Sequence, residues 1–349
     1  MPFVSFASLK EYMEQLLPKL GLSQADAAVM SQIYIDTTKR GMGHHDINML
    51  PMRLKALRSG AINPNPHFQR LSSFGGMERW DGDNGPGEVI NHFSMQRAID
   101  LAAQHGMGLC AVRNSNHYLC SAPYVAQAAQ QGCIGLIISK GVPTMGVPGA
   151  KGCVVGQSPI GFAFPTREDW PVMLDISLAY TSGLQLFQRA KQGVSVPPWW
   201  GVDENGEATT DPDKLLRGVR YPIGEHKGFG LAILCELLTG VLSGGLILDQ
   251  DEDMEGMAAR STAHTAIAIK ADALMDRETY LERSTDLIHR IQARADGVRL
   301  PGQSSWSKRQ VLEAQGSVQL SQLLWDELNK YARDCGTVQL TDCAPQEKE

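Results

Sequence analysis

The chain has 349 residues, and at roughly 100–200 residues per domain this length predicts two domains around a sizeable core. Hydrophobic residues make up 43% of the chain and charged residues 20%, which is close to the globular average and excludes bulk disorder. The 32 Lys and Arg against 38 Asp and Glu give a net charge of −6. This balance argues against a nucleic-acid partner, since duplex binding needs a basic face.

The seven cysteines are odd in number and form no Cys-x-x-Cys pair, which favours reduced thiols over a disulfide framework or a zinc site. Residues 1–4 show no basic or apolar leader, so we expect a cytoplasmic protein. Residues 228–248 are long enough to span a bilayer and carry one charge. Because several glycines interrupt this run, we interpret it as a core helix followed by a turn and expect no membrane partner.

Three helices are predicted in the first 60 residues. Ser8 and Glu11 fit a capping box that would open the first helix. Residues 23–39 place apolar side chains at helical spacing and predict the second. Asp46 is expected to cap the third, which Gly60 would end.

From about residue 70 the pattern alternates between strands and helices. Further helices are predicted over 88–105, 122–131, 184–192, 228–241, 277–293 and 321–332, and strands over 108–112, 134–138, 161–165, 171–176 and 265–269. The expected organisation is a helical domain over 1–72, an α/β domain over 73–272, and helices over 273–349 that pack back on the first domain.

The nucleotide-binding fingerprints of common α/β folds are missing. No Gly-x-Gly-x-x-Gly follows a predicted strand, and no Walker A sequence is present. The nearest glycine cluster, residues 224–230, precedes a long apolar helix, so free helix amides and Lys227 could hold a phosphate. The alternative is an ordinary glycine-rich helix start with a solvated lysine.

Two histidine-containing segments carry possible chemistry. His44 and His45 are adjacent and would diverge too far to chelate one ion, so no metal is predicted. A single histidine there could serve as a general acid, because the unperturbed histidine pKa of about 6.5 suits proton exchange at neutrality. The alternative interpretation is a pair of surface histidines at a turn. Residues 114–118 follow a strand, where either ligand contacts or a polar turn would fit. No Gly-x-Ser-x-Gly elbow supports a serine hydrolase.

Seven short segments stand in a specific order and spacing: residues 78–81, 113–117, 156–159, Asp175, residues 226–228, 242–245 and 299–302. With them, the chain resembles the type 2 malate/L-lactate dehydrogenase family of NAD(P)-dependent 2-oxoacid oxidoreductases over nearly its whole length. The resemblance implies an α/β (α+β) fold with a mainly antiparallel, non-Rossmann sheet domain, an α-helical domain built from both chain ends, and a homodimer.

The family motif Arg-Gly-x-x-Ser-His-Gly-x-x-Arg-Leu-Pro falls on residues 40–51. The resemblance implies that His45 is the catalytic proton donor, with His44 in the place of the family's relay Ser, where it would orient or crowd the donor. Gln185 stands where some members have a relay Asp. Met49 stands where the family has the Arg that holds the substrate carboxylate.

A missing carboxylate-binding arginine needs a replacement. Arg53 lies four residues after Met49, on the same face of the predicted helix, and could reach the substrate; a solvent-facing arginine is the alternative. The resemblance also places Gln157 at the substrate. It implies NAD(H) or NADP(H) as cofactor, with contacts from His117, Tyr118, Leu119, Cys120, Ser121, Met173, Leu174, Asp175, Ile176, Ser177, His226, Lys227, Gly302, Gln303 and Ser304.

The function implied is hydride transfer between NAD(P)H and C2 of a small 2-oxoacid or 2-hydroxyacid of the malate, lactate or diketogulonate type. Reduction of a cyclic imine-2-carboxylate is an alternative within the same chemistry. A non-catalytic NAD(P)-binding member of the family is a second alternative, since the relay and carboxylate-binding residues are replaced. A metal-dependent hydrolase built on His44, His45 and Asp46 is the third.

Overall fold

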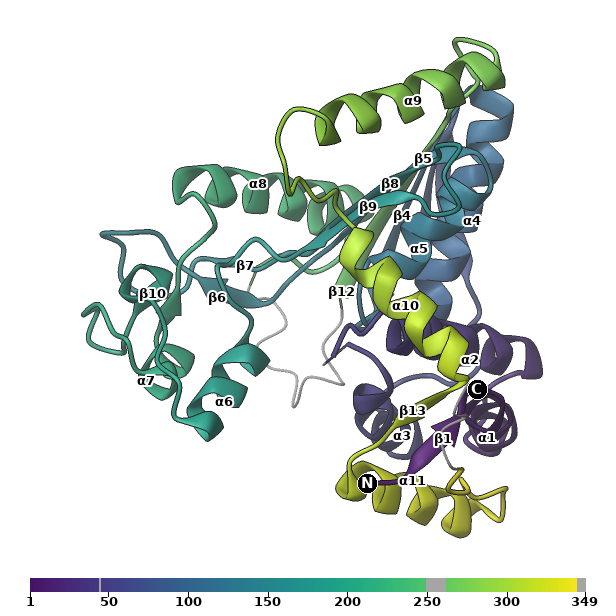
Figure 1. Ribbon diagram of the computed structural model, residues 1–349, viewed down its shortest axis with the longest axis vertical. Coiled ribbons are helices and arrows are strands. Elements are labelled where there is room, and N and C mark those ends of the chain that lie inside the picture. Colours follow the sequence, from purple (N-terminus) through teal and green to yellow (C-terminus); the bar gives the residue numbers. More distant parts are fainter. Residues whose placement is uncertain (44, 249–261, 344–349) are drawn as a thin grey trace.

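The structure is a computed structural model that describes residues 1–43, 45–248 and 262–343. A seven-stranded sheet forms its centre (Figure 1), in the order β2-β3-β4-β12-β5-β8-β9. Neighbouring strands pair antiparallel except β3 and β4, which are parallel. The strands are β2 (Gln69–Phe74), β3 (Met77–Asp81), β4 (Met107–Ser115), β5 (Cys133–Ser139), β8 (Ile160–Phe164), β9 (Val172–Ile176) and β12 (Thr262–Lys270).

Two helices, α4 (Gly87–His105) and α5 (Ala122–Gln130), pack against each other and against this sheet. They approach closely because glycines stand opposite them: a Cβ on Gly108 would collide with the Ala98 carbonyl, and one on Gly135 would lie 2.5 Å from the Ala128 Cβ. The helix α8 (His226–Glu236) continues into a π-helical turn, Leu237–Val241, which also contacts the sheet. The helix α9 (Arg277–Gln292) lies at the far end of the sheet from the termini (Figure 1).

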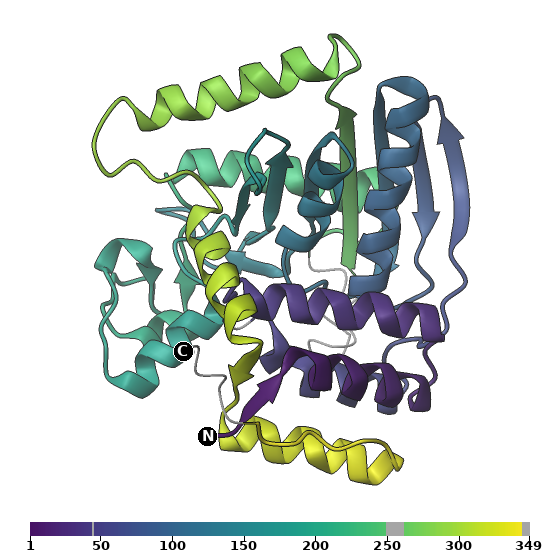
Figure 2. The same ribbon diagram turned by 45° about the vertical axis from the view of Figure 1, so that its right-hand side comes forward.

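Both ends of the chain build one helical region beside the sheet. The strand β1 (Phe3–Ser5) pairs antiparallel with β13 (Ser317–Gln319), and the Tyr12 hydroxyl donates to the Leu328 carbonyl at 2.7 Å. Figure 2 shows α10 running from the sheet down to the N-terminal helices. The helices of this region are α1 (Phe6–Lys19), α2 (Gln24–Lys39), α3 (Leu50–Arg58), α10 (Gln303–Gln315) and α11 (Gln322–Cys335).

A smaller lobe lies to one side of the main sheet (Figure 1). Its four-stranded sheet has the order β10-β11-β6-β7, and each strand has only two or three residues. Such short strands leave no periodicity to detect, so the sequence did not predict them. The lobe contains β6 (Pro143–Met145), β7 (Val155–Gly156), α6 (Gly183–Gln192), β10 (Gly201–Val202), α7 (Pro212–Arg217) and β11 (Val219–Arg220).

The α/β class and all the predicted helices and strands are confirmed, with two corrections to their ends. Ser8 is not the cap of α1: Ser5 occupies that position, and its hydroxyl accepts from the Ser8 amide at 3.0 Å. Asp46 accepts from the Asn48 amide and caps a short 3-10 turn, Ile47–Met49, from which α3 then starts at Leu50. The boundaries at residues 72 and 272 stay predictions.

Two further expectations failed for physical reasons. The helix α10 was not predicted, because none of its side chains is fully buried and its apolar periodicity is therefore weak. The run after Gly228 was interpreted as a core helix, but α8 and the following turn leave several large apolar side chains exposed. Among the described residues, no helix combines the length and apolar character needed to cross a bilayer.

Candidate functional site

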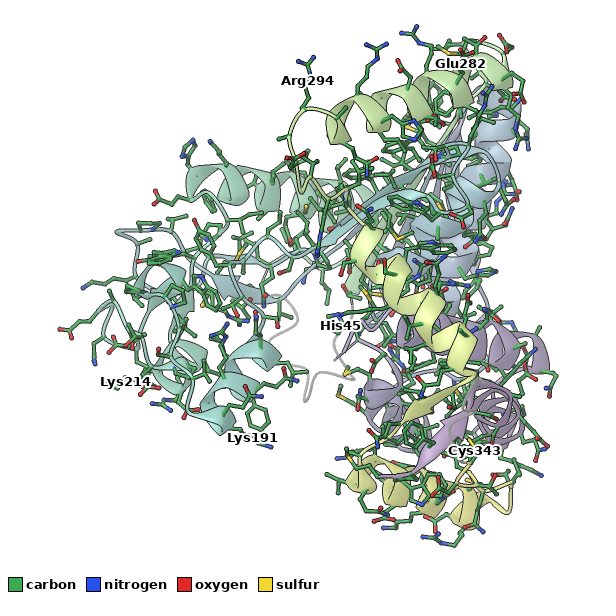
Figure 3. The ribbon with its side chains drawn as sticks, viewed as in Figure 1. His45, Lys191, Lys214, Glu282, Arg294 and Cys343 are labelled. Atoms are coloured by element: carbon green, nitrogen blue, oxygen red, sulfur yellow. The ribbon has the colours of Figure 1, made fainter. Side chains whose placement is uncertain are left out.

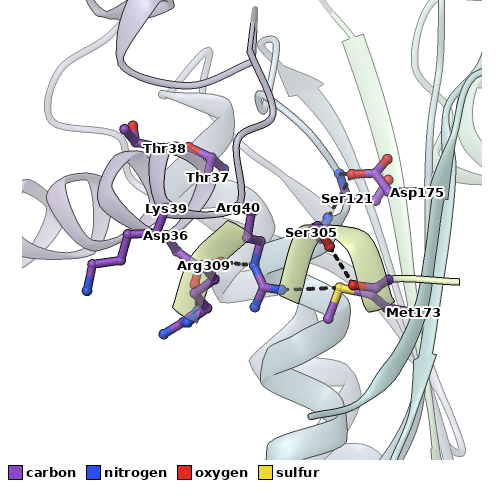
Figure 4. Close-up of polar contacts among 12 residues, drawn as sticks. Asp36, Thr37, Thr38, Lys39, Arg40, Ser121, Met173, Asp175, Ser305 and Arg309 are labelled. Carbon is purple, nitrogen blue, oxygen red and sulfur yellow. Dashed lines mark hydrogen bonds and ion pairs between the residues drawn. The ribbon is translucent and has the colours of Figure 1, made fainter. Parts of the chain in front are cut away.

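The Asp36 carboxylate joins both chain ends to the main sheet (Figure 4). It accepts a hydrogen bond from Arg40 Nε at 2.7 Å and forms an ion pair with Arg309 of α10. Arg40 is itself buried, and its Nη1 donates to the sulfur of Met173 at 3.5 Å. These contacts hold α2, α10 and the strand β9 together at one point.

The start of α10 is seated against β9 by a glycine. Gly302 has a left-handed φ of +87°, and a Cβ there would lie 2.7 Å from Met173 Cγ. The Met173 amide also donates to the Pro301 carbonyl at 3.2 Å. Two of the segments expected at the cofactor, residues 173–177 and 302–304, are therefore brought together.

The third such segment, residues 117–121, joins them through Asp175. One oxygen of this carboxylate accepts from the amides of Ser121 at 2.9 Å and Ala122 at 3.0 Å (Figure 4). A negative charge is stabilising at the N-terminus of a helix, here α5. Burial raises the pKa of Asp175, and these hydrogen bonds act in the opposite direction.

The fourth segment expected at the cofactor, residues 226–227, is linked to the end of β9 by backbone hydrogen bonds. Residues beyond β9 form a bridge between Ala179 and Pro222, and the Ile223 amide donates to the Leu178 carbonyl at 2.9 Å. His226 and Lys227 follow as the first residues of α8, and both are exposed. No side chain caps this helix start, but the Lys227 and Gly228 amides donate to backbone carbonyls of the preceding turn at 3.1 and 3.0 Å. Within the described residues, this leaves the His226 amide as the one of the first three that could bind a ligand.

The expected proton donor lies beside the predicted cofactor segments. The rings of His45 and His117 meet edge to face with their centroids 5.2 Å apart. Figure 3 shows His45 between α10 and the small lobe. His44, the neighbour expected to orient or crowd the donor, lies outside the described residues. Met49 packs partly buried against the N-terminal core, which agrees with a purely apolar role.

Arg53 is not the solvent-facing arginine of the alternative interpretation, because its side chain is only 6% exposed. Its Nε pairs with the fully buried Glu88 at 3.1 Å, and Nη2 donates to the His117 carbonyl. Tyr34 donates to the same carboxylate at 3.1 Å. These contacts position the loop at His117, while direct binding of substrate by Arg53 stays a prediction.

Gln157 lies in a hydrogen-bonded chain of the small lobe. Its amide satisfies both of its polar atoms when the oxygen accepts from Arg220 Nη1 at 2.6 Å and Thr144 Oγ1 at 3.2 Å, and the nitrogen donates to the Thr181 carbonyl at 3.3 Å. The Thr181 hydroxyl donates to Gln185, the residue at the relay position, at 2.9 Å. These hydrogen bonds connect Gln157, expected at the substrate, with Gln185 at the relay position.

Two residues of this region were missed in the sequence. Arg220 lies on a two-residue strand without a motif, and only the loss of arginine at position 49 hints that another cation is needed. His264 is fully buried in β12, where its Nε2 contacts the Asn116 carbonyl at 3.1 Å and its ring lies 5.1 Å from that of Tyr118. Burial lowers its pKa to about 4.

His264 predicts a specific acid sensitivity. Its pKa falls from 6.5 to about 4 on folding, so the folded protein binds fewer protons than the unfolded chain. The contribution of the neutral ring, on the order of 3 kcal/mol, is complete above pH 6.5 and is lost as the pH falls towards 4. His264→Gln should flatten the dependence of unfolding free energy on pH in this window, measured by denaturant titration. The exposed His67→Gln is the control, and equal slopes for parent and His264→Gln would contradict the assignment.

Comparison with known proteins identifies the family of the chain. Residues 4–329 match the family described as malate/L-lactate dehydrogenase. A 2,3-diketo-L-gulonate reductase from Klebsiella pneumoniae (strain 342) is 33% identical over 307 residues, which cover 86% of this chain and 91% of that protein.

Solved structures show the same fold. A sulfolactate dehydrogenase from Methanocaldococcus jannaschii matches with a TM-score of 0.88 at 26% identity, over 96% of this chain and 98% of that one. A delta1-piperideine-2-carboxylate reductase from Pseudomonas syringae pvar. tomato matches with a TM-score of 0.87 at 25% identity, over 95% of this chain and all of that one (100%). The resemblance inferred from the motifs is confirmed: the chain belongs to the malate/L-lactate dehydrogenase family.

Proposed function

We propose that the protein is an oxidoreductase that transfers a hydride between NAD(P)H and C2 of a small 2-oxoacid or 2-hydroxyacid. The observation that carries the proposal is the convergence on one strand end, β9, of the segments expected at a dinucleotide, with His45 next to His117. The names of its relatives, which include a 2,3-diketo-L-gulonate reductase and a sulfolactate dehydrogenase, support the same reaction class.

The residues present fit a dinucleotide. The start of α10 lacks a side-chain cap, so the Ser304 and Ser305 amides of its first turn can bind phosphate oxygens. Lys227 adds a positive charge at the first turn of α8, and Gly302 allows close approach at α10. When bound, the nicotinamide supplies the hydride, while the protein supplies orientation and electrostatics.

His45 would move the proton. As C2 is reduced, its carbonyl oxygen gains negative charge, and an imidazolium within hydrogen-bond reach can donate a proton to that oxygen. In the reverse direction the neutral ring accepts the proton from the hydroxyl. Arg53 would act indirectly, because its bond to the His117 carbonyl fixes the loop beside His45.

A cyclic imine-2-carboxylate is a second candidate substrate class, favoured by the similarity to the delta1-piperideine-2-carboxylate reductase. The carbon that accepts the hydride and the carboxylate are placed as in a 2-oxoacid, so the same site would serve, with the ring nitrogen in place of the carbonyl oxygen.

The protein would be a cytoplasmic homodimer. Within each subunit, residues 1–72 and 273–349 would form the helical domain, and residues 73–272 the α/β domain. The surface expected to pair is the apolar face of α8 and its continuation. These side chains are each between 42% and 53% exposed, and several large apolar side chains exposed together on one helix are typical of a protein–protein contact surface. They are Leu231, Ile233, Leu234, Leu237, Val241 and Leu242.

The first prediction concerns turnover and His45. The parent should consume NADH or NADPH, followed at 340 nm, with at least one member of a panel of 2-oxoacids and cyclic imine-2-carboxylates. His45→Ala should lower kcat by ~10²–10⁴-fold, because the proton donor is lost, while nucleotide binding persists. The exposed His67→Ala is the matched control. Tight NADH binding without turnover in the parent would favour a non-catalytic member. Hydrolysis that a chelator abolishes, without consumption of the nucleotide, would favour the metal-dependent hydrolase.

The second prediction concerns Lys227. Lys227→Ala should raise the nucleotide KM by about 10-fold, because a charge-assisted hydrogen bond to a phosphate is removed. The KM for the oxoacid and the melting temperature should stay as in the parent, since the side chain is exposed. Lys214→Ala, also exposed, is the control. A nucleotide KM that does not move would remove Lys227 from the cofactor site.

The third prediction concerns assembly. Leu234→Glu places a charge in the centre of the apolar α8 face and should convert the dimer to monomer in sedimentation experiments. Leu274→Glu changes a leucine that is 96% exposed and lies outside that face, and it should leave the dimer intact. A parent that sediments as a monomer would show that this face does not mediate self-association.

A further inference from the structure

Arg220 is a buried cation without an anion. Arg220 is only 7% exposed, and burial lowers the pKa of its guanidinium. In the part of the chain that the structure describes, it forms no ion pair, and its Nε has no hydrogen-bond partner. Its side-chain hydrogen bond goes to the neutral oxygen of Gln157. An unpaired charge in this position is costly unless a ligand supplies the countercharge.

The other buried arginines of the described residues differ in this respect. Arg40 pairs with Asp36 at 2.7 Å and Arg53 pairs with Glu88 at 3.1 Å, so both charges are neutralised within the fold. Only the guanidinium of Arg220 remains to bind an external anion among these three.

The surroundings of Arg220 place it at the proposed site. Gln157 holds Nη1, and the Gln157 carbonyl accepts from the Leu178 amide at 2.7 Å, three residues after Asp175. The first residue of α6 is Gly183, and a Cβ there would lie 3.4 Å from Nη1, so the start of this helix lies directly beside the guanidinium. The part of the small lobe that holds Arg220 is therefore bonded, through Gln157, to the residue Leu178 just after β9.

We propose that Arg220 binds the carboxylate of the 2-oxoacid substrate and replaces the charge that the family motif has at position 49, here Met49. A planar guanidinium can offer a carboxylate two parallel N–H donors, which a methionine cannot. The Gln157 oxygen fixes the plane of the fork through Nη1, and the buried Nε–H has no hydrogen-bond partner among the described residues. The inference rests on the proposed function and deepens it.

The test uses Arg220→Met, with Arg217→Met as matched control. Arg217 lies on the same lobe but is exposed and pairs with Glu204 at the surface. For each protein, three quantities are measured: the KM for an oxoacid that the parent reduces, the Kd of oxamate in the presence of NADH, and the melting temperature. Oxamate has the shape and the carboxylate of a small 2-oxoacid but is not reduced, so its binding can be measured without turnover.

We expect Arg220→Met to raise the oxoacid KM and the oxamate Kd on the order of 10²-fold, because one partner of a buried charge pair is lost. The Kd of NADH should not change, and the melting temperature should stay or rise, because a buried unpaired cation becomes an apolar side chain. Arg220→Lys should bind oxamate with intermediate affinity, and guanidinium ion should restore part of the oxamate binding of Arg220→Ala. Arg217→Met should behave as the parent.

Two results would overturn the assignment. Oxamate binding unchanged in Arg220→Met would show that the carboxylate lies elsewhere. A lower melting temperature with equal losses of NADH and oxamate binding would show that Arg220 has a structural role. Either result leaves the proposed function intact as long as the parent reduces oxoacids. A parent that binds NADH but neither oxamate nor any oxoacid would instead contradict the proposed function itself.

Discussion

The arrangement of the site depends on one carboxylate shared by two arginines. Asp36, near the end of α2, binds Arg40 from its own helix and Arg309 from the C-terminal helix α10. The sequence separation between Asp36 and Arg309 is large, so this contact fixes the two ends of the chain relative to each other. Because Arg40 also reaches Met173, and Gly302 packs on the same methionine, the start of α10 is held against β9. Together with the ion pair between Arg53 and Glu88 of α4, this contact holds the helical region against the sheet and places His45 near the strand end.

The buried charges of the protein fall into two groups with different consequences. Asp36 and Glu88 pair with arginines and Asp175 accepts from helix amides, so the partners of these carboxylates within the fold hold one arrangement of helices and strands. Arg220 is not neutralised within the described residues, and its burial therefore lowers stability. Binding sites often contain a charged group that lowers the stability of the free protein and is paired only when the ligand binds, because stability and function compete there.

The sequence predicted those parts of the fold that have a long apolar period. The helices α2 and α4 and the strands β4 and β5 bury one face or both, and their pattern was sufficient. The strands of the small lobe and α10 could not be predicted in this way, because these strands are too short and the helix buries no complete side chain. For the site, motif order identified the segments at His117, Asp175, Lys227 and Gly302, but not their contacts. Arg220 was missed because a buried unpaired charge is a property of three-dimensional surroundings, which a single arginine on a two-residue strand does not reveal.

The proposed reaction transfers a hydride directly from the nicotinamide to C2 of the substrate. This can be followed with NADH or NADPH deuterated at C4 of the nicotinamide, with the product analysed by NMR and mass spectrometry. One of the two stereospecifically labelled nucleotides should deliver one deuterium to C2 of the 2-hydroxyacid (or of the cyclic amino acid), while the proton on the neighbouring oxygen or nitrogen comes from the solvent. A product whose C2 hydrogen comes from the solvent, or nucleotide consumption without a reduced product, would contradict direct hydride transfer.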